Sequence, residues 1–203
     1  LPETAFRKSK PGRETLVSLS RQIGAAGRNS EIALVLKTLG TLPASEKPLV
    51  ETLVQALIEK QKGKSRERIL AAAGGRGAEI VAAMLTAART KAIDDKTDVA
   101  ERVEAVRVLR LAKFAVARPL FVELLELRQP QPVQAATLET IAEFDDAKVS
   151  DVLLDAWSSL SPGLRTRAVE TMLSRPKWVT AFLNAVEKGN VGRGDVEPSR
   201  VQL

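Results

Sequence analysis

The residue types that most often carry catalysis are missing from this chain of 203 residues. It contains no histidine, no cysteine and no tyrosine. Histidine is the usual general base and metal ligand near neutral pH, and a cysteine thiolate is the usual sulfur nucleophile. Only carboxylate, lysine or serine chemistry remains, and the sequence shows no activated arrangement of these groups. We therefore predict that the chain is not itself an enzyme and that it has no catalytic, cofactor-binding or metal-binding residues.

Carboxylates are the first group that could still do chemistry. They occur close together in three places, where a pair could act as acid and base or bind a hard cation. Each place is a link between predicted helices or the start of one, where a carboxylate caps exposed backbone N–H groups. We interpret all of them as structural: Asp94, Asp95, Asp98, Asp145, Asp146, Asp151 and Asp155.

Basic side chains form two clusters that could grip phosphate. The denser run lies at a predicted junction between helices and consists of Lys60, Lys62, Lys64, Arg66 and Arg68. The second is a strip at steps of three residues, with Arg102 and Arg118 nearby, made of Arg107, Arg110 and Lys113. A solvated helix face is the other interpretation of this strip, because glutamates lie at neighbouring helical positions.

The two tryptophans are further candidates for recognition. Trp178 directly precedes Val179 near a predicted helix start, and it could be a stacking platform or an interface anchor. Trp157 falls on an apolar stripe with Val149, which favours packing between repeats. Trp178 therefore joins the basic residues of both clusters as the candidate interaction surface.

The net charge of +6 is unevenly distributed along the chain. Residues 131–161 contain six carboxylates and a single lysine, between segments that are net basic. A nucleic-acid footprint is expected as a clustered basic face or stripe. The acidic segment interrupts such a stripe, so the basic composition is a weak argument for a polyanionic partner.

The elements that must position these side chains repeat along residues 99–188. Three segments share apolar slots at steps of 30 and 31 residues: Val103, Val133 and Leu164, then Val108, Leu138 and Val169, then Leu111, Ile141 and Met172. A second apolar set follows each first set: Phe121, Leu124 and Leu125, then Val149, Val152 and Leu153, then Val179, Phe182 and Leu183. Repetition at a period of roughly 20–50 residues is typical of a solenoid or array.

No sustained alternation of period two predicts a strand, and alanine and leucine favour helices. We predict an all-α fold, an α-solenoid of antiparallel helix pairs of the HEAT or armadillo type. Its expected parts are a basic lead-in at 1–13, degenerate helical repeats at 14–98, three clear repeats at 99–188 and a tail at 189–203. The tail looks like the start of a truncated helix, which suggests a fragment of a longer protein.

Glycine and proline set the expected helix boundaries. Pro2, Pro11 and Gly12 should break any element in the lead-in, and Gly24 and Gly27 should end the first helix. Asn29 or Ser30 should cap the next helix. A short helix at 65–73 should end at Gly74-Gly75, with another from Ala78 to about Lys91. Helices should begin at three prolines, with Ser161 as the cap before the last of them: Pro119, Pro132 and Pro162.

Several short motifs carry a more specific likeness. They are Arg128-Gln129-Pro130-Gln131, Phe144-Asp145-Asp146, Trp157, Leu160-Ser161-Pro162 and Leu173-Ser174-Arg175-Pro176-Lys177-Trp178. Through these motifs the chain resembles the HEAT-like segment of large multidomain c-type cytochrome proteins of planctomycete and verrucomicrobial type. These proteins are also described as membrane-bound dehydrogenase-like. In that family a β-propeller precedes the repeats and a haem domain with Cys-x-x-Cys-His follows them. The resemblance implies an extracytoplasmic setting. The chain departs from that family in having no cysteine and no histidine, so we expect no haem ligation by this chain.

Two functions follow as hypotheses. The first is a non-catalytic scaffold or interaction module that spaces or docks protein domains, including domains of its own redox parent. It would not insert into a membrane, because no window approaches the ~18 apolar residues of a span. The alternative is a nucleic-acid-binding HEAT-like protein that uses basic surface patches, in the manner of the HEAT-like alkylpurine DNA glycosylases. The site of those enzymes matches no positions in this sequence.

Overall fold

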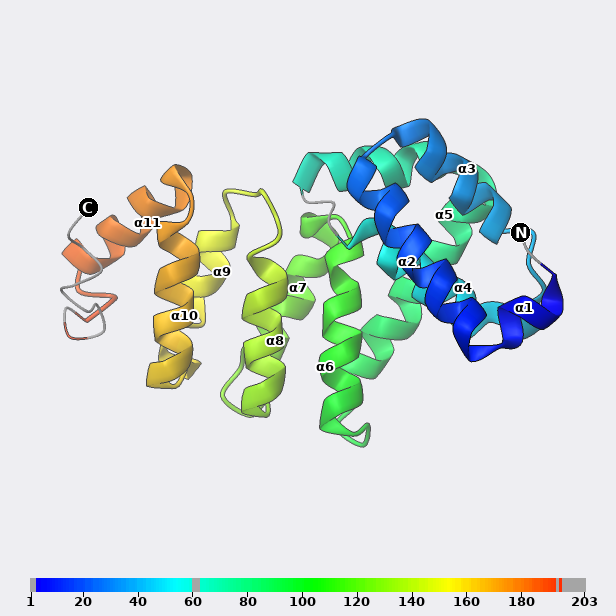
Figure 1. Ribbon diagram of the computed structural model, residues 1–203. Helices are drawn as coiled ribbons and strands as arrows, with labels where there is room; N and C mark the ends of the chain where they lie inside the picture. The colour runs from blue at the N-terminus through cyan, green and yellow to red at the C-terminus, as the bar shows by residue number, and fades with distance from the viewer. Residues whose placement is uncertain (1–2, 60–62, 193, 195–203) are drawn as a thin grey trace. The chain divides into compact units, whose positions relative to one another are not determined.

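The computed structural model describes residues 3–59, 63–192 and 194, with the backbone alone for residues 63–76. Every regular element in this part of the chain is a helix, so the predicted all-α class is confirmed (Figure 1). The chain divides into two compact units, residues 1–87 and residues 88–203, called unit 1 and unit 2 below.

Unit 1 is built around the contact between two of its helices, α2 and α4. In order, its elements are α1 (Thr4–Lys8), α2 (Lys10–Ala26), α3 (Asn29–Leu39), the 3-10 turn η1 (Ala44–Glu46), α4 (Lys47–Ile58) and the first part of α5 (Gly63–Ile93). Helix α1 packs on α2, and α3 contacts both α2 and α4. Leu36, Val54 and Leu57 are fully buried in the resulting core.

The predicted unstructured lead-in is wrong, because residues 4–8 form α1 and α2 already begins at Lys10. Ser9 caps α2: its hydroxyl oxygen accepts a hydrogen bond from the Gly12 N–H at 3.1 Å. Pro11 lies in the first turn of α2, where its missing N–H costs no helical hydrogen bond.

A buried ion pair ties α1 to the start of α4. The Arg7 guanidinium donates from Nε to Oε2 of Glu46 at 2.7 Å and from Nη2 to Oε1 at 2.9 Å. Both side chains are about nine-tenths buried. The hydrogen bond from Arg7 lowers the pKa of the Glu46 carboxyl below its ordinary value of 4.5, against the opposing effect of burial.

This pair predicts a specific acid sensitivity. A lowered folded-state pKa contributes stability that is present above the unfolded value and is lost as pH falls through the folded value. We expect Glu46→Gln to flatten the fall in Tm as the pH drops below about 4.5. Thermal melts of both proteins between pH 7 and 3 measure this. Glu59→Gln, which removes an exposed pair with Arg21, is the control and should follow the wild-type curve. Parallel curves for Glu46→Gln and the wild type would contradict the prediction.

The prediction that Gly24 ends α2 is wrong. Gly24 lies inside this helix, where α2 meets α4. A Cβ at this position would lie 1.9 Å from the Leu57 carbonyl oxygen, so only glycine allows the two backbones to approach this closely. Gly27 does end the helix, with φ of 67° in the left-handed region. The N-cap of α3 is Arg28, without a side-chain capping bond, so the predicted caps Asn29 and Ser30 are wrong.

Helix α5 runs without a break from Gly63 to Ile93, so the predicted end at Gly74-Gly75 is also wrong. A glycine costs a helix only about 1 kcal/mol relative to alanine. The boundary between the two units falls within this helix.

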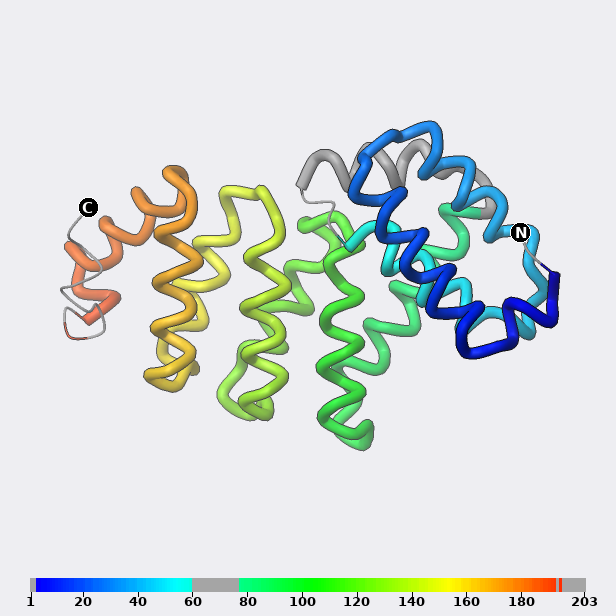
Figure 2. Tube along the Cα trace, in the orientation of Figure 1, coloured from blue at the N-terminus to red at the C-terminus, as the bar shows by residue number. Residues whose placement is uncertain are grey.

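Unit 2 places three helices next to one another in a row, as Figures 1 and 2 show: α6 (Val99–Val108), α8 (Gln131–Ile141) and α10 (Pro162–Leu173). The intervening elements are η2 (Leu109–Leu111), α7 (Phe114–Leu124), α9 (Val149–Asp155) and η3 (Trp157–Ser159), and α11 (Pro176–Glu187) follows α10. Helix α7 contacts α8 and α9, and α11 contacts α9 and α10.

The predicted apolar slots form most of the core of unit 2. All nine residues of the first set are buried or pack against the buried cluster. In the second set the exceptions lie on α11, where Val179 is only partly buried and Leu183 is 52% exposed. The rings of Phe114, Phe121 and Phe144 fill the centre, with centroids 5.4 to 6.3 Å apart.

Proline positions were predicted correctly in two of three cases. Pro132 and Pro162 lie in the first turns of α8 and α10, and Ser161 is the N-cap residue of α10. Pro119 instead lies inside α7, which begins at Phe114. Burial of Phe114, Ala117 and Phe121 along one face of α7 outweighs the roughly 3 kcal/mol cost of an interior proline.

Candidate interaction surface

The structure describes the side chains of four of the nine residues predicted for the interaction surface. Lys60 and Lys62 fall outside the described residues, as do the side chains of Lys64, Arg66 and Arg68. Trp178 is 0% exposed, so its predicted place on the surface is wrong. Arg107 and Lys113 are exposed and Arg110 is partly buried.

Arg102, predicted to lie beside the basic strip, is buried inside unit 2. Its guanidinium donates from Nε to the Ala92 carbonyl oxygen at 2.9 Å and from Nη2 to the side-chain oxygen of Gln129. Both acceptors are uncharged oxygens that the interior must satisfy. Arg102 is therefore part of the core and is not available to a ligand.

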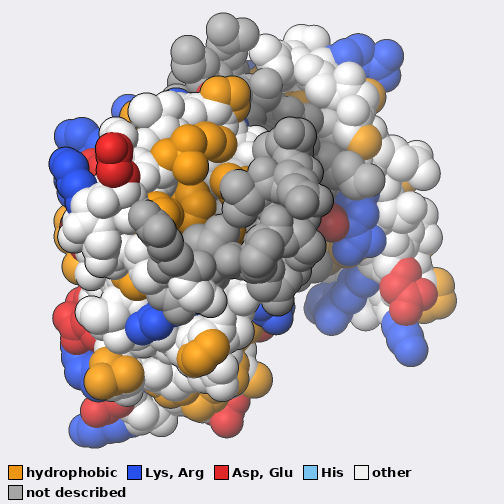
Figure 3. All heavy atoms as spheres, turned by 90° about the vertical axis from the view of Figure 1, so that its left-hand side faces the viewer, with side chains coloured by type: hydrophobic (Ala, Val, Ile, Leu, Met, Phe, Trp, Pro, Cys, Tyr) orange, Lys and Arg blue, Asp and Glu red, His pale blue; other side chains and the backbone are white. Residues whose placement is uncertain are grey.

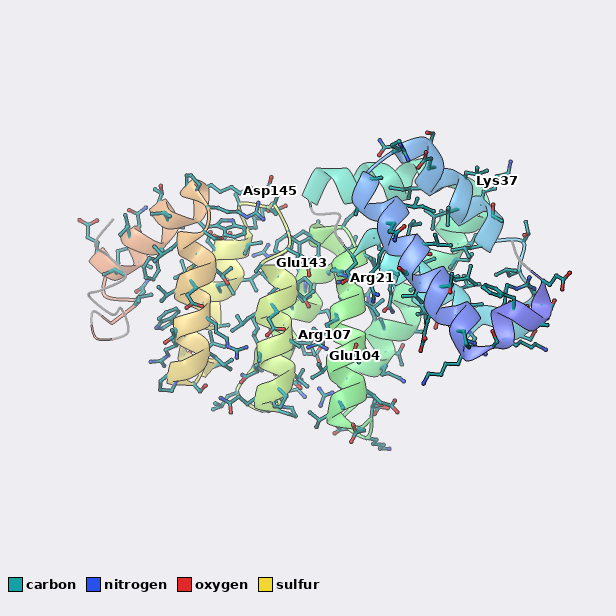
Figure 4. The ribbon with its side chains drawn as sticks, viewed as in Figure 1. Arg21, Lys37, Glu104, Arg107, Glu143 and Asp145 are labelled. Atoms are coloured by element: carbon teal, nitrogen blue, oxygen red, sulfur yellow. The ribbon has the colours of Figure 1, made fainter. Side chains whose placement is uncertain are left out.

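Instead, ion pairs between oppositely charged side chains connect the helices of the row. We call this set, Glu104, Arg107, Glu139 and Arg167, the ladder. Arg107 on α6 pairs with Glu104 of the same helix and lies 4.0 Å from Glu139 on α8. Glu139 also accepts from Arg167 on α10 at 3.0 Å. Figure 4 labels Glu104 and Arg107 on α6, and Glu143 and Asp145 in the segment after α8. Glu139, in the acidic segment 131–161, thus pairs with basic residues on both neighbouring helices.

Two further contacts extend the same pattern. Arg110 Nη1 lies 4.0 Å from Glu143 Oε1. Asp145 accepts from Arg175 at 2.9 Å and from Lys177, at the start of α11. The hydrogen bond from Lys177 and the nearby charges of Lys177 and Arg175 hold the pKa of the Asp145 carboxyl below its ordinary range. Three of the six acidic residues of 131–161, Glu139, Glu143 and Asp145, therefore pair with basic residues from the flanking segments.

Hydrogen bonds between the repeats recur at nearly constant sequence separation. Arg167 and Glu139 are 28 residues apart, and both Gln131 with Ser161 and Arg175 with Asp145 are 30 apart. The Trp178 indole N–H donates to the Asp146 carbonyl oxygen, 32 residues away, at 2.8 Å. These separations agree with the 30- and 31-residue steps of the apolar slots. Polar and apolar contacts thus set the same register between successive helices.

Trp178 is covered by the cations that bind Asp145. The Arg175 guanidinium lies 4.8 Å and the Lys177 ammonium 5.9 Å from its ring centroid. Contacts of this length are cation–π interactions. They stabilise the start of α11 against the loop that precedes α9.

The ladder predicts a small, salt-sensitive stability effect. Glu139→Gln removes the partner of both Arg107 and Arg167, and we expect a loss of no more than about 1 kcal/mol, because all three side chains are half exposed. The loss should shrink at about 1 M NaCl, where charges are screened within ~3 Å. Urea unfolding at low and high salt measures it. A loss of the same size at both salt concentrations would contradict an electrostatic ladder.

Four of the seven candidate carboxylates, Asp94, Asp98, Asp145 and Asp146, act as caps or counter-ions. Asp98 accepts from the Ala100 N–H at 2.8 Å at the start of α6, and Asp146 accepts from the Lys148 N–H at 2.9 Å. Asp94 accepts from the Lys96 N–H and the Thr97 hydroxyl, which lowers its pKa. Within the described residues no three acidic, histidine or cysteine side chains gather as metal ligands. The helices of this part of the chain include none that is long and apolar enough to span a membrane.

The sequence contained a signal for the ladder that the search for basic clusters missed. The net charge changes sign from one repeat to the next, and side chains one repeat apart meet on adjacent helices. Glu139, Asp145, Arg167 and Arg175 could have been paired on that basis.

Comparison of the chain with known protein families, with curated proteins and with solved structures gave no match.

Proposed function

We propose that the chain is a non-catalytic scaffold, an α-solenoid of antiparallel helix pairs that docks or spaces other protein domains. The observation that carries the proposal is the agreement between two registers. Apolar slots recur every 30 or 31 residues, and several hydrogen bonds between successive repeats span 28 to 33 residues. Such nearest-neighbour contacts are characteristic of solenoid repeats, which serve mainly as extended binding surfaces.

The ladder favours a protein partner over a nucleic acid. A phosphate backbone needs cations that are free to replace its counter-ions. Arg107 and Arg110 each face a carboxylate, and Glu104 and Glu139 lie on the same surface as these arginines. Viewed from the side of the C-terminal helices, acidic and basic side chains lie next to one another over the surface (Figure 3). Phosphate would have to displace existing ion pairs and would meet carboxylates beside them.

A titration against duplex DNA tests this choice. Anisotropy of a labelled duplex should stay unchanged up to micromolar protein at both 50 mM and 200 mM salt. Phosphate contacts would produce binding at the lower salt that falls steeply at the higher. That result would favour the nucleic-acid function and would contradict the protein scaffold.

The resemblance to multidomain cytochromes extends the proposal to the parent protein. There the repeats would hold a dehydrogenase-like domain and a haem domain at a fixed separation. The reading frame around residues 1 and 203 tests this, and we expect Cys-x-x-Cys-His downstream. In the expressed parent, deletion of residues 14–188 should leave the haem absorbance unchanged and slow electron transfer to the haem. A parent without a haem motif would remove the redox role and leave the scaffold.

A further inference from the structure

Helices α7 and α9 present a more apolar surface than the charged ladder. Helix α7 exposes apolar side chains along one side, where Val116 is 53% and Val122 41% exposed. Pro119 lies between them and has no N–H, so the carbonyl of exposed Ala115 lacks its helical donor. This side of α7 offers water an apolar stripe that includes one available backbone acceptor.

The stripe leads to a small cavity between α7 and α9, which we call the notch. Its volume is about 100 Å³, and it is lined by Val122, Leu125, Glu126, Val152, Asp155, Ala156 and Ser159. Leu125 and Val152 are fully buried and form its floor, while Glu126 and Asp155 are exposed. An aliphatic side chain could rest on this floor with carboxylates on either side.

The charge at the notch is unfavourable for the isolated fold. Glu123 lies in the last turn of α7, Glu126 just beyond it, and Asp155 is the last residue of α9. The negative end of a helix dipole disfavours carboxylates by about 0.3–1 kcal/mol each, and neither helix has a basic residue in its last turn.

Arg128 compensates only part of this charge. It bridges Glu123 at 3.1 Å and Glu126 at 2.6 Å, which leaves one negative charge in that group. Among the described residues no cation pairs with Asp155. Two negative charges therefore remain at the edge of an apolar notch, although the chain as a whole is net positive.

We propose that a basic amphipathic segment of a partner protein binds in the notch. This inference rests on the scaffold role proposed above. An aliphatic side chain of the segment enters the notch, and lysines or arginines one helical turn to either side meet Glu126 and Asp155. The segment's apolar face continues along Val122 and Val116. This is the helix-in-groove mode of peptide recognition. An acidic peptide or a phosphate backbone would be repelled at the same place.

Labelled peptides test the proposal on the complete chain. The probes are a 14-residue peptide of leucine and lysine with helical amphipathic spacing, the same peptide with glutamate for lysine, and a scrambled leucine–lysine peptide. Anisotropy titrations should show saturable binding of the first only. Glu126→Lys with Asp155→Lys should weaken it at least about tenfold, and Val122→Asn should weaken it several-fold.

A second double variant controls for total charge. Glu14→Lys with Asp95→Lys changes the net charge by the same amount at exposed carboxylates that do not line the notch, and affinity should stay within about twofold. Equal weakening by both double variants would overturn the proposal, as would binding that ignores the notch variants. Absence of binding at millimolar peptide would also overturn it. If the peptide fails and duplex DNA also fails to bind, only the notch proposal falls. Salt-dependent DNA binding would overturn the scaffold role itself.

Discussion

Trp178→Ala is expected to lower the free energy of unfolding by about 4 kcal/mol, the middle of the range for truncating a buried aromatic side chain. Trp178 lies at the start of α11 and is the largest of the fully buried side chains. Its removal leaves a cavity between α11 and its neighbours and deprives the Asp146 carbonyl of its indole donor. Urea unfolding followed by circular dichroism measures the change.

Two neighbouring variants make this result interpretable. Trp178→Phe keeps a ring but loses the donor to the part-buried Asp146 carbonyl, and we expect an intermediate loss of about 1 kcal/mol, the net contribution of a typical hydrogen bond. Lys177→Ala removes an exposed cation from Asp145, which keeps Arg175, so the loss should stay below about 1 kcal/mol. If Trp178→Ala costs no more than Lys177→Ala, Trp178 is not the anchor of α11.

Gly24→Ala is expected to destabilise the protein by about 3 kcal/mol, the upper part of the usual range for overpacking. The new methyl carbon would lie 1.9 Å from the Leu57 carbonyl oxygen and 3.3 Å from its Cα. The obstacle is backbone, which cannot rotate away as a side chain can. Helices α2 and α4 would have to separate, although their contact is the centre of unit 1. The change in Tm and in the urea midpoint measures this.

Gly163→Ala is the matched control. It makes the same chemical change in the first turn of α10, where a Cβ would have nothing within 4 Å. We expect a gain of about 0.5 kcal/mol, because alanine restricts the unfolded chain more than glycine does. If Gly24→Ala and Gly163→Ala lower the stability equally, the loss does not come from close packing at Gly24, and the prediction is contradicted.

The all-α class and several helix starts could be predicted because their signals are local. Ser161-Pro162 and Asp98 mark helix starts through the geometry of a single turn. The apolar slots of residues 99–188 were predictable for a similar reason. Each is fixed by its own helix and by a neighbour one repeat away.

Features set by distant contacts could not be predicted from local patterns. Gly24 has the same type as a helix-ending glycine, and only the approach of Leu57 reveals its role. Pro119 marks a helix start by the usual rule, but burial of the aromatic residues around it extends α7 past that rule. Glu46 is an ordinary surface residue in sequence, and its burial depends on Arg7, 39 residues away.

The candidate surface was the least predictable part. A search for like charges selected Arg107, Arg110 and Lys113, whereas the folded chain places opposite charges together. Arg102 and Trp178 are amphipathic side chains that suit either a surface or a core with hydrogen-bond acceptors. Only the positions of Gln129 and the Asp146 carbonyl decide between these environments.

The span of 28 to 33 residues between several bonded partners in unit 2 also bears on how the chain folds. Contacts between residues close in sequence close short loops, so they form quickly and need no distant segment. Each helix of the row can therefore find its partner as soon as about thirty further residues have been synthesised. We expect unit 2 to assemble stepwise during translation, with each completed repeat serving as the template for the next.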